Sequence, residues 1–383
     1  MNLLGNDKID SYSNGEGDMF SPALFVENIS KDSKIKKILW LYQSQNPVVH
    51  FNNGTETDDK YIQAIMLCYS NMSKLGVNEN AKLLAKELKQ DELNKFAAEI
   101  FSKWILAGAD TKKKWVLYFA AIHGGNDIID TFLYYIKEWS KNSRGAIAAE
   151  AVKALALNRN SKALMAIDSI SHEFNYKQVK SAAVQIIDNL ANELGITSDE
   201  LSDKLVPDLG FNEKVERSFD YGTRKFKVYL TPSLELEIYD ENNKKLKNLP
   251  VPSKKDDEKI AKQLYLEFQQ MEEQLKDVIS IQRSRLADAL FTDRRWSREA
   301  WDNLFVKNPI MHSFAIELIW AVYKNDKLVQ TTRYMEDGSF NTYYDEDKYE
   351  LPDNCTIGLI NPANLNESPF ISKNLKHYCF LVI

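Results

Sequence analysis

The arginines of this chain are concentrated in one stretch whose chemistry suits the binding of anions. Five of the ten arginines fall within it, namely Arg283, Arg285, Arg294, Arg295 and Arg298. A guanidinium group donates paired hydrogen bonds to a phosphate or a carboxylate, and Trp296 in the same stretch can stack on a base or on a guanidinium. The pattern predicts an anion-binding or partner-binding surface.

An internal role for the same arginines is the alternative. Residues 276–298 carry six cations and three acids, whereas residues 335–353 carry seven acids and one cation. Because both segments belong to one small predicted domain, their opposite charges can pair with each other. The sequence leaves both interpretations open.

A second candidate site is the stretch DYGTR at residues 220–224. Its glycine permits a positive φ angle or a close approach of the backbone to a ligand. Tyr221 and Arg224 can then line a pocket together with Arg295 and Arg333. A tight turn at the entrance to a strand explains the same residues equally well.

None of the common catalytic motifs occurs in the sequence. It contains no GxxxxGK(S/T) phosphate loop, no GxGxxG, no HExxH and no GxSxG. The five histidines are scattered singly, and the three cysteines lie far apart at Cys68, Cys355 and Cys379, without the spacing of a metal site. We therefore expect no metal and no cofactor and favour a non-enzymatic protein; the alternative is an enzyme whose pocket is assembled from residues that no motif reveals.

The composition narrows the compartment and the class of partner. The net charge of −6 and the pI of about 5.6 argue against tight, non-specific DNA binding by the whole chain, although a local basic patch is compatible with them. Dispersed cysteines indicate a reducing compartment. No stretch resembles a signal peptide or approaches the ~20 apolar residues of a transmembrane helix. We expect a cytoplasmic protein that binds another protein, with nucleic acid as the alternative partner and no membrane association.

Three regions must position these residues. Residues 1–20 are polar and lack periodicity, which predicts a mobile N-terminus. Residues 21–206 repeat apolar side chains at helical spacing in antiparallel pairs, with a period of roughly 30 residues, which predicts an irregular HEAT-like helical array. Within it, a short helix is predicted over 34–43, and Thr197 and Glu200 have the spacing of a capping box.

Residues 207–383 predict a smaller α+β domain with antiparallel hairpins and one long helix. Segments 224–230 and 234–239 alternate apolar and polar residues, as half-buried strands do. An apolar stripe continues along a helix over 257–290. A further helix over 298–307 is predicted from a cap at its first turn.

The core of this domain is predicted to form around Trp320. Residues 318–323 are an uncharged apolar run of strand length, which predicts a buried strand paired with residues 328–335. The long helix has the apolar stripe that can cover Trp320. The dipeptide Asp337-Gly338 marks a hairpin turn, and a last strand is expected over 356–360.

Several stretches resemble one protein family. They are FAAEIFSKWILAGADTKKKW (96–115), LVPDLGF (205–211), DYGTRKF (220–226), LPVPSKKDD (249–257) and the segment 294–340. They are similar to the domain of unknown function DUF4132, found in bacterial proteins described as molybdate metabolism regulators. The resemblance extends from about residue 80 to 365 and implies a regulatory role. Larger relatives often add a WGR module, but no Trp-Gly-Arg tripeptide occurs here.

The sequence thus predicts a multidomain protein of mixed α and α+β class, in which a helical array (21–206) precedes an α+β domain of the DUF4132 type (207–383). A non-enzymatic binding, scaffold or regulatory protein is the leading functional hypothesis. The competing hypothesis is a regulator that binds nucleic acid, nucleotides or other anions through the arginines of residues 283–298.

Overall fold

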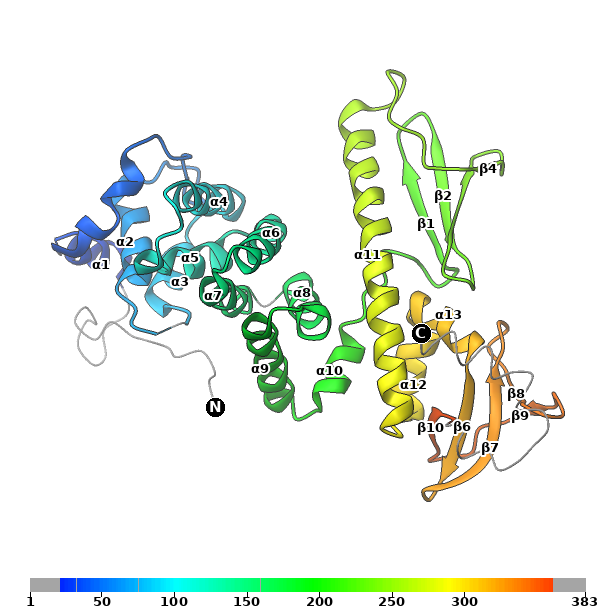
Figure 1. Ribbon diagram of the computed structural model, residues 1–383. Helices are drawn as coiled ribbons and strands as arrows, with labels where there is room; N and C mark the ends of the chain where they lie inside the picture. Colours follow the sequence, from blue (N-terminus) through cyan, green and yellow to red (C-terminus); the bar gives the residue numbers. More distant parts are fainter. Residues whose placement is uncertain (1–20, 32, 75, 159, 361–383) are drawn as a thin grey trace. The chain divides into compact units, whose positions relative to one another are not determined.

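The computed structural model describes residues 21–31, 33–74, 76–158 and 160–360 (Figure 1). The chain divides between Leu205 and Val206 into two compact units, each with its own hydrophobic core. The first unit is helical, and the second combines helices with two antiparallel sheets, so the predicted mixed α and α+β class is confirmed. Among the described residues, no helix has the length and apolar character needed to span a membrane.

The first unit is built from helices, most of which are joined by short connections. Its elements are α1 (Pro22–Ser30), η2 (Ser33–Lys37), η3 (Leu39–Tyr42), α2 (Asp59–Ser70), α3 (Glu79–Ala85), α4 (Gln90–Leu106), η4 (Thr111–Lys113), α5 (Trp115–His123), α6 (Asp127–Lys141), α7 (Gly145–Leu155), α8 (Ser161–Glu173), α9 (Lys177–Leu194) and α10 (Ser198–Lys204).

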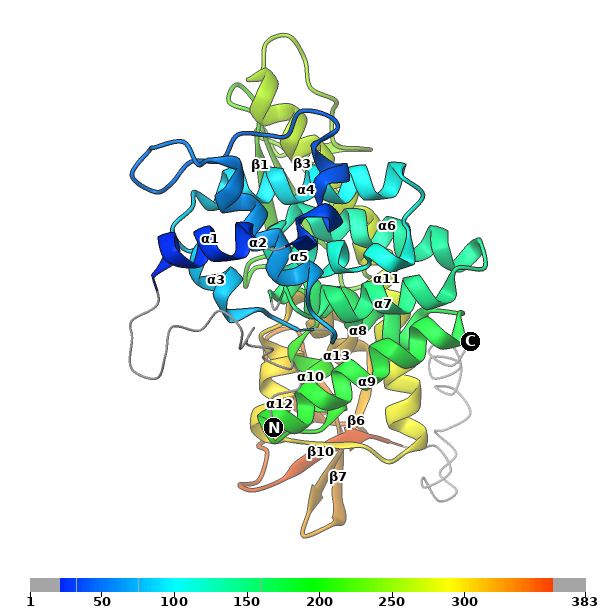
Figure 2. The same ribbon diagram turned by 90° about the vertical axis from the view of Figure 1, so that its left-hand side faces the viewer.

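The alanine-rich helix α7 lies at the centre of the second half of this unit. Its Ala148, Ala151 and Ala154 are fully buried, and it packs against α5, α6 and α9 (Figure 2). Small side chains allow neighbouring helices to approach closely, which explains how one short helix contacts several others. At the end of the unit, the capping box predicted for Thr197 and Glu200 is present at the start of α10.

The prediction of one short helix over residues 34–43 is wrong. The structure has two 3₁₀ helices there, η2 and η3. Ile38 and Leu41 are fully buried, and Ile35 packs against the same core. Apolar residues that recur every third position share one side of a 3₁₀ helix, which has three residues per turn.

The second unit begins with a four-stranded antiparallel sheet of order β1-β2-β3-β4. Its strands are β1 (Glu216–Asp220), β2 (Lys225–Leu230), β3 (Leu236–Asp240) and β4 (Lys245–Leu246), and the 34-residue helix α11 (Glu258–Phe291) follows. Phe219 of β1 packs edge-on against Phe268 of α11, with ring centroids 5.6 Å apart. The sheet therefore buries one face against the first half of the long helix.

A six-stranded antiparallel sheet of order β5-β10-β6-β7-β8-β9 completes the unit. Its elements, with the helices between them, are β5 (Arg295–Ser297), α12 (Arg298–Trp301), the π-helical η5 (Asp302–Val306), α13 (Pro309–Glu317), β6 (Ile319–Lys324), β7 (Lys327–Tyr334), β8 (Phe340–Thr342), β9 (Lys348–Tyr349) and β10 (Thr356–Leu359). The helix predicted over 298–307 is thus an α-helical turn that widens into a π-helix.

Trp320 lies fully buried on β6, directly opposite Thr332 of β7, which confirms the predicted strand pairing. The buried α11 residues Leu286, Ala289 and Leu290 belong to the same hydrophobic core as Trp320. The rings that contact Trp320 belong to Trp296, Trp301 and Phe305, at centroid distances of 6.2, 5.2 and 4.7 Å. These residues come from β5, α12 and η5, so this short connection supplies an aromatic cover that the sequence analysis did not predict.

Candidate functional sites

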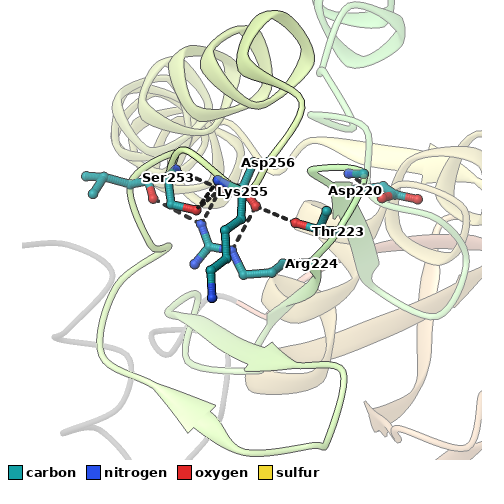
Figure 3. Close-up of polar contacts among 8 residues, drawn as sticks. Asp220, Thr223, Arg224, Ser253, Lys255 and Asp256 are labelled. Atoms are coloured by element: carbon teal, nitrogen blue, oxygen red, sulfur yellow. Dashed lines mark hydrogen bonds and ion pairs between the residues drawn. The ribbon is translucent and has the colours of Figure 1, made fainter.

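The carboxylate of Asp256 binds the Arg224 side chain in a bidentate ion pair (Figure 3). Arg224 Nε donates to Oδ1 at 3.0 Å and Nη2 donates to Oδ2 at 2.6 Å. Thr223 Oγ1 donates to Oδ1, and the backbone N–H and hydroxyl of Ser253 both donate to Oδ2. These bonds, led by those from Arg224, hold the pKa of the buried Asp256 carboxyl well below its usual range.

Local backbone geometry explains why the chain turns here. Gly222 has a φ of +88°, which glycine adopts without strain, and its N–H donates to the carboxylate of Asp220. The carbonyl of Tyr221 accepts from the N–H of Asp257, whose side chain caps α11. The stretches DYGTRKF and LPVPSKKDD therefore meet at one buried ion pair that joins the first sheet to the start of α11.

The structure does not bring this turn together with the other predicted site residues. Tyr221 contacts the first residues of α11, whereas Arg295 follows the end of that helix. A helix of 34 residues is about 50 Å long at a rise of 1.5 Å per residue. The pocket predicted from Tyr221, Arg224, Arg295 and Arg333 is therefore not formed, and the ion pair with Asp256 occupies Arg224.

Arg285, Arg295 and Arg298 of the cluster have polar partners, most of them close in sequence. Arg285 is buried and donates to the side chain of Gln282 at 3.0 Å. The guanidinium of Arg295 pairs with Asp293 at 2.7 Å and lies 3.5 Å from Asp326, and Arg298 lies 3.9 Å from Asp302. Arg298 also donates one hydrogen bond to the acidic segment 335–353, and its acceptor is the backbone carbonyl of Leu351. The structure therefore favours internal pairing, but with local acids.

Aromatic rings hold two of these guanidinium groups in place. Arg294 lies over Trp296 at 4.8 Å and Arg295 lies over Tyr323 at 3.7 Å. Trp296 is 4% exposed and packs against Phe305, so it cannot stack on a base as predicted. Gly358 lies beside Arg295 on the neighbouring strand, and a Cβ there would come within 3.4 Å of the Arg295 side chain.

Arg295 and Arg333 do share one face of the six-stranded sheet. Residues opposite each other in an antiparallel pair project to the same side of the sheet. Arg295 lies opposite Gly358, which in turn lies opposite Ala321 of β6. Arg333 lies opposite Ile319, which is two residues from Ala321 on the same strand and so projects to the same side. This face is the reverse of the one that carries Trp320. Arg333 is exposed on it, and Arg283 is exposed on α11.

A hollow that the sequence analysis missed runs along α9 in the helical unit. It has a volume of about 610 Å³ and is lined by Phe174, Asn175, Lys177, Lys180, Ser181, Val184, Gln185 and Asp188. The α9 residues in this set recur every three or four positions and so share one helix face. Polar residues separate the few apolar residues that line the hollow. This face of α9 therefore lacks the continuous apolar stripe from which buried helix faces are predicted.

Comparison with known proteins supports the predicted family resemblance. Residues 244–377, which include α11 and the six-stranded sheet, match the model of a domain of unknown function, DUF4132. The chain is 29% identical over 273 residues to the uncharacterized protein YehI of Escherichia coli (strain K12). That similarity covers 70% of this chain and 22% of YehI, so the chain spans about a fifth of that relative's length. No solved structure matches the chain significantly.

Proposed function

We propose that the protein is a non-enzymatic binding protein whose helical unit holds a macromolecular partner along α9. The observation that carries the proposal is the hollow of about 610 Å³ on the outer face of that helix. The other faces of α9 pack against α7, α8 and α10. The helix is thus fixed on several sides while one face is presented outward, as in helical arrays that bind macromolecules.

The lining of the hollow indicates the chemistry of the partner. Val184 is 38% exposed at its centre, and Tyr176 is 41% exposed beside it. Lys177 and Lys180 line its first turn, and the Lys180 ammonium also donates to the carbonyl of His172. Apolar groups beside cations suit a peptide that presents apolar side chains and carboxylates from one helical face.

The test is capture of partners from a cell extract, identified by mass spectrometry, with the parent protein and two variants. Val184→Asp introduces a charge into the hollow and is expected to remove the captured partner. Leu106→Asp makes the same kind of change at a residue that is 84% exposed on α4, outside the hollow, and is expected to retain it. An unchanged partner set with Val184→Asp contradicts the proposal, as does turnover of a small molecule without any reproducible partner.

The second candidate function is an anion-binding regulator that uses the arginines of residues 283–298 together with Arg333. The shared sheet face of Arg295 and Arg333 favours it, whereas the ion pairs of Arg295 and Arg298 oppose it. Titration with inorganic phosphate and with nucleotides tests it. Binding that is lost in Arg333→Ala but kept in Lys262→Ala supports this function, and no binding by the parent at low salt rejects it.

A role in molybdate metabolism and a cytoplasmic location are also proposals. The first follows from the family resemblance, and molybdoenzyme activity in a deletion strain tests it. The second is consistent with Cys68 and Cys355, which are buried free thiols. Fractionation of cells that express the tagged protein tests the location.

A further inference from the structure

Two lysine-rich segments that are distant in sequence meet at Trp40 in the helical unit. One is KIKK at residues 34–37, and the other is KKK at residues 112–114. The ammonium of Lys113 lies over the Trp40 ring, 4.3 Å from its centroid, and Trp40 Nε1 donates to the carbonyl of Lys37 at 2.9 Å. The fold therefore places the 3₁₀ helices η2, η3 and η4 side by side.

Four lysines form what we call the lysine patch: Lys36, Lys37, Lys112 and Lys113. The first three are exposed, and Lys113 is half-buried against Trp40. Lys37 is held in position because its ammonium donates to the carbonyl of Ser70 and to the side chain of Asn71, both at 3.1 Å. Neutral partners fix the ammonium group without cancelling its charge.

The charge of the lysine patch depends on whether acids pair with its lysines. Some other surface lysines pair with carboxylates, as Lys162 does with Asp130 and Lys262 does with Glu258. Within the part of the chain that the structure describes, none of the four patch lysines forms an ion pair with an acid. The carboxylate of Asp110 lies nearby, where it accepts from the backbone N–H of Lys112. The patch is thus positive, although the chain carries a net charge of −6.

A fifth cation adds to this local charge. The Lys103 ammonium lies within 3.2 Å of the backbone carbonyls of Leu41, Ser44 and Gln45 and 2.6 Å from the side-chain oxygen of Asn46. These contacts fasten the loop that follows η3 and Trp40. Their oxygens are uncharged, so Lys103 also contributes positive charge without a carboxylate partner.

We propose that the lysine patch binds the phosphate backbone of nucleic acid without sequence recognition. Lysine ammonium groups act as flexible point charges, which suits phosphates arranged along a strand. Trp40 is covered on one face by Lys113 and packs against the core, so it supplies no platform for stacking a base. Nothing in the patch reads base edges. The surface is separate from the α9 hollow, and the inference does not depend on the proposed function.

An anionic membrane presents similar phosphates, but the patch suits it less well. Proteins that lie on membranes insert a continuous apolar face between the lipids in addition to their electrostatic attraction. Here, Leu39 is the apolar side chain that stands exposed among the lysines, at 47%. We therefore assign the surface to nucleic acid and treat binding to vesicles as the outcome that contradicts this assignment.

The expected signature is the salt dependence of binding. Each phosphate neutralised on a duplex releases counterions, so four contacts give a slope of roughly −3.6 in a plot of log K against log salt concentration. The double variant Lys36→Ala/Lys112→Ala removes the two lysines of the patch whose side chains form no hydrogen bond or ion pair within the described residues. It should weaken binding and reduce the slope to roughly −1.8.

The experiment uses the full chain and a short labelled DNA duplex, titrated between about 50 and 200 mM salt. The matched control is Lys141→Ala/Lys162→Ala, which removes two cations from α6 and α8 of the same unit and should leave the slope unchanged. Circular dichroism melting shows whether both double variants remain folded. No binding by the parent at the lowest salt, or equal slopes for the parent and the patch variant, overturns the proposal. Binding to phosphatidylserine vesicles without binding to DNA overturns it as well.

Discussion

Replacing Trp320 with alanine tests the packing of the second unit most directly. Its side chain is fully buried, contacts the rings of Trp296, Trp301 and Phe305, and donates from Nε1 to the carbonyl of Ala315 at 2.9 Å. Removal of a buried large aromatic side chain costs about 3–5 kcal/mol. The unpaired carbonyl of Ala315 adds about 1 kcal/mol. This loss is a large part of the ~5–15 kcal/mol by which domains are stable.

The assay must isolate the second unit, because the two units need not unfold together. Thermal unfolding followed by near-ultraviolet circular dichroism, with hydrogen exchange of peptides from β6 and β7, reports on it. Trp320→Ala should lower the Tm of this unit by roughly 10 °C and remove exchange protection from both strands. Leu328→Ala, at a β7 residue that is 44% exposed, should change stability by less than about 0.5 kcal/mol. A Trp320→Ala variant as stable as the parent refutes the reasoning.

Three further predictions concern charge and capping. The pKa of Asp256 is lowered in the folded state, so its contribution to stability is complete above its ordinary pKa of 3.8 and is lost as the pH falls below that value. The difference in Tm between the parent and Asp256→Asn should therefore be largest at neutral pH and should become smaller in acid. Burial lowers the pKa of His123 from 6.5 to about 4. As the pH is lowered through this range, the unfolded chain takes up a proton that the folded chain does not, so the free energy of unfolding should decrease. His123→Asn should flatten that part of a plot of Tm against pH. Thr197→Ala removes the capping box of α10 and should cost about 1 kcal/mol in urea unfolding of the helical unit, whereas no change would show that this cap does not stabilise the helix.

Local patterns predicted the elements whose apolar residues follow one clear period. The cap at Thr197, the strand around Trp320 and the turn at Gly338, which has a φ of +83°, each depend on residues close together in sequence. Strand β1 escaped prediction because Phe219 is its one buried residue, so no alternation is visible. Strands β8 and β9 have three and two residues and form through pairing with neighbouring strands, which no local pattern contains.

The family-like stretches show a different limit of sequence reasoning. DYGTR was predicted either as a ligand pocket or as a turn, and its spacing alone could not separate the two. The deciding residue is Asp256, which lies 32 positions from Arg224 and accepts a pair of hydrogen bonds from its guanidinium. A bidentate site looks the same in sequence whether its anion comes from a ligand or from the chain itself.

The same argument explains why the sequence analysis predicted a site at the arginines but missed the lysine patch. The arginines are clustered in sequence and were therefore easy to recognise. In the folded chain, however, Arg295 and Arg298 pair with acids that are adjacent in sequence or are brought close by the sheet. Lys36 and Lys112 are 76 residues apart in the sequence, and the contacts of Trp40 with Lys113 and with the carbonyl of Lys37 bring their two segments together. What determines whether a cation can bind a ligand is the absence of a nearby carboxylate in the folded chain, and that depends on tertiary contacts. A chain with a net negative charge can therefore carry a local site for a polyanion, because charges more than about 10 Å away are largely screened at physiological salt.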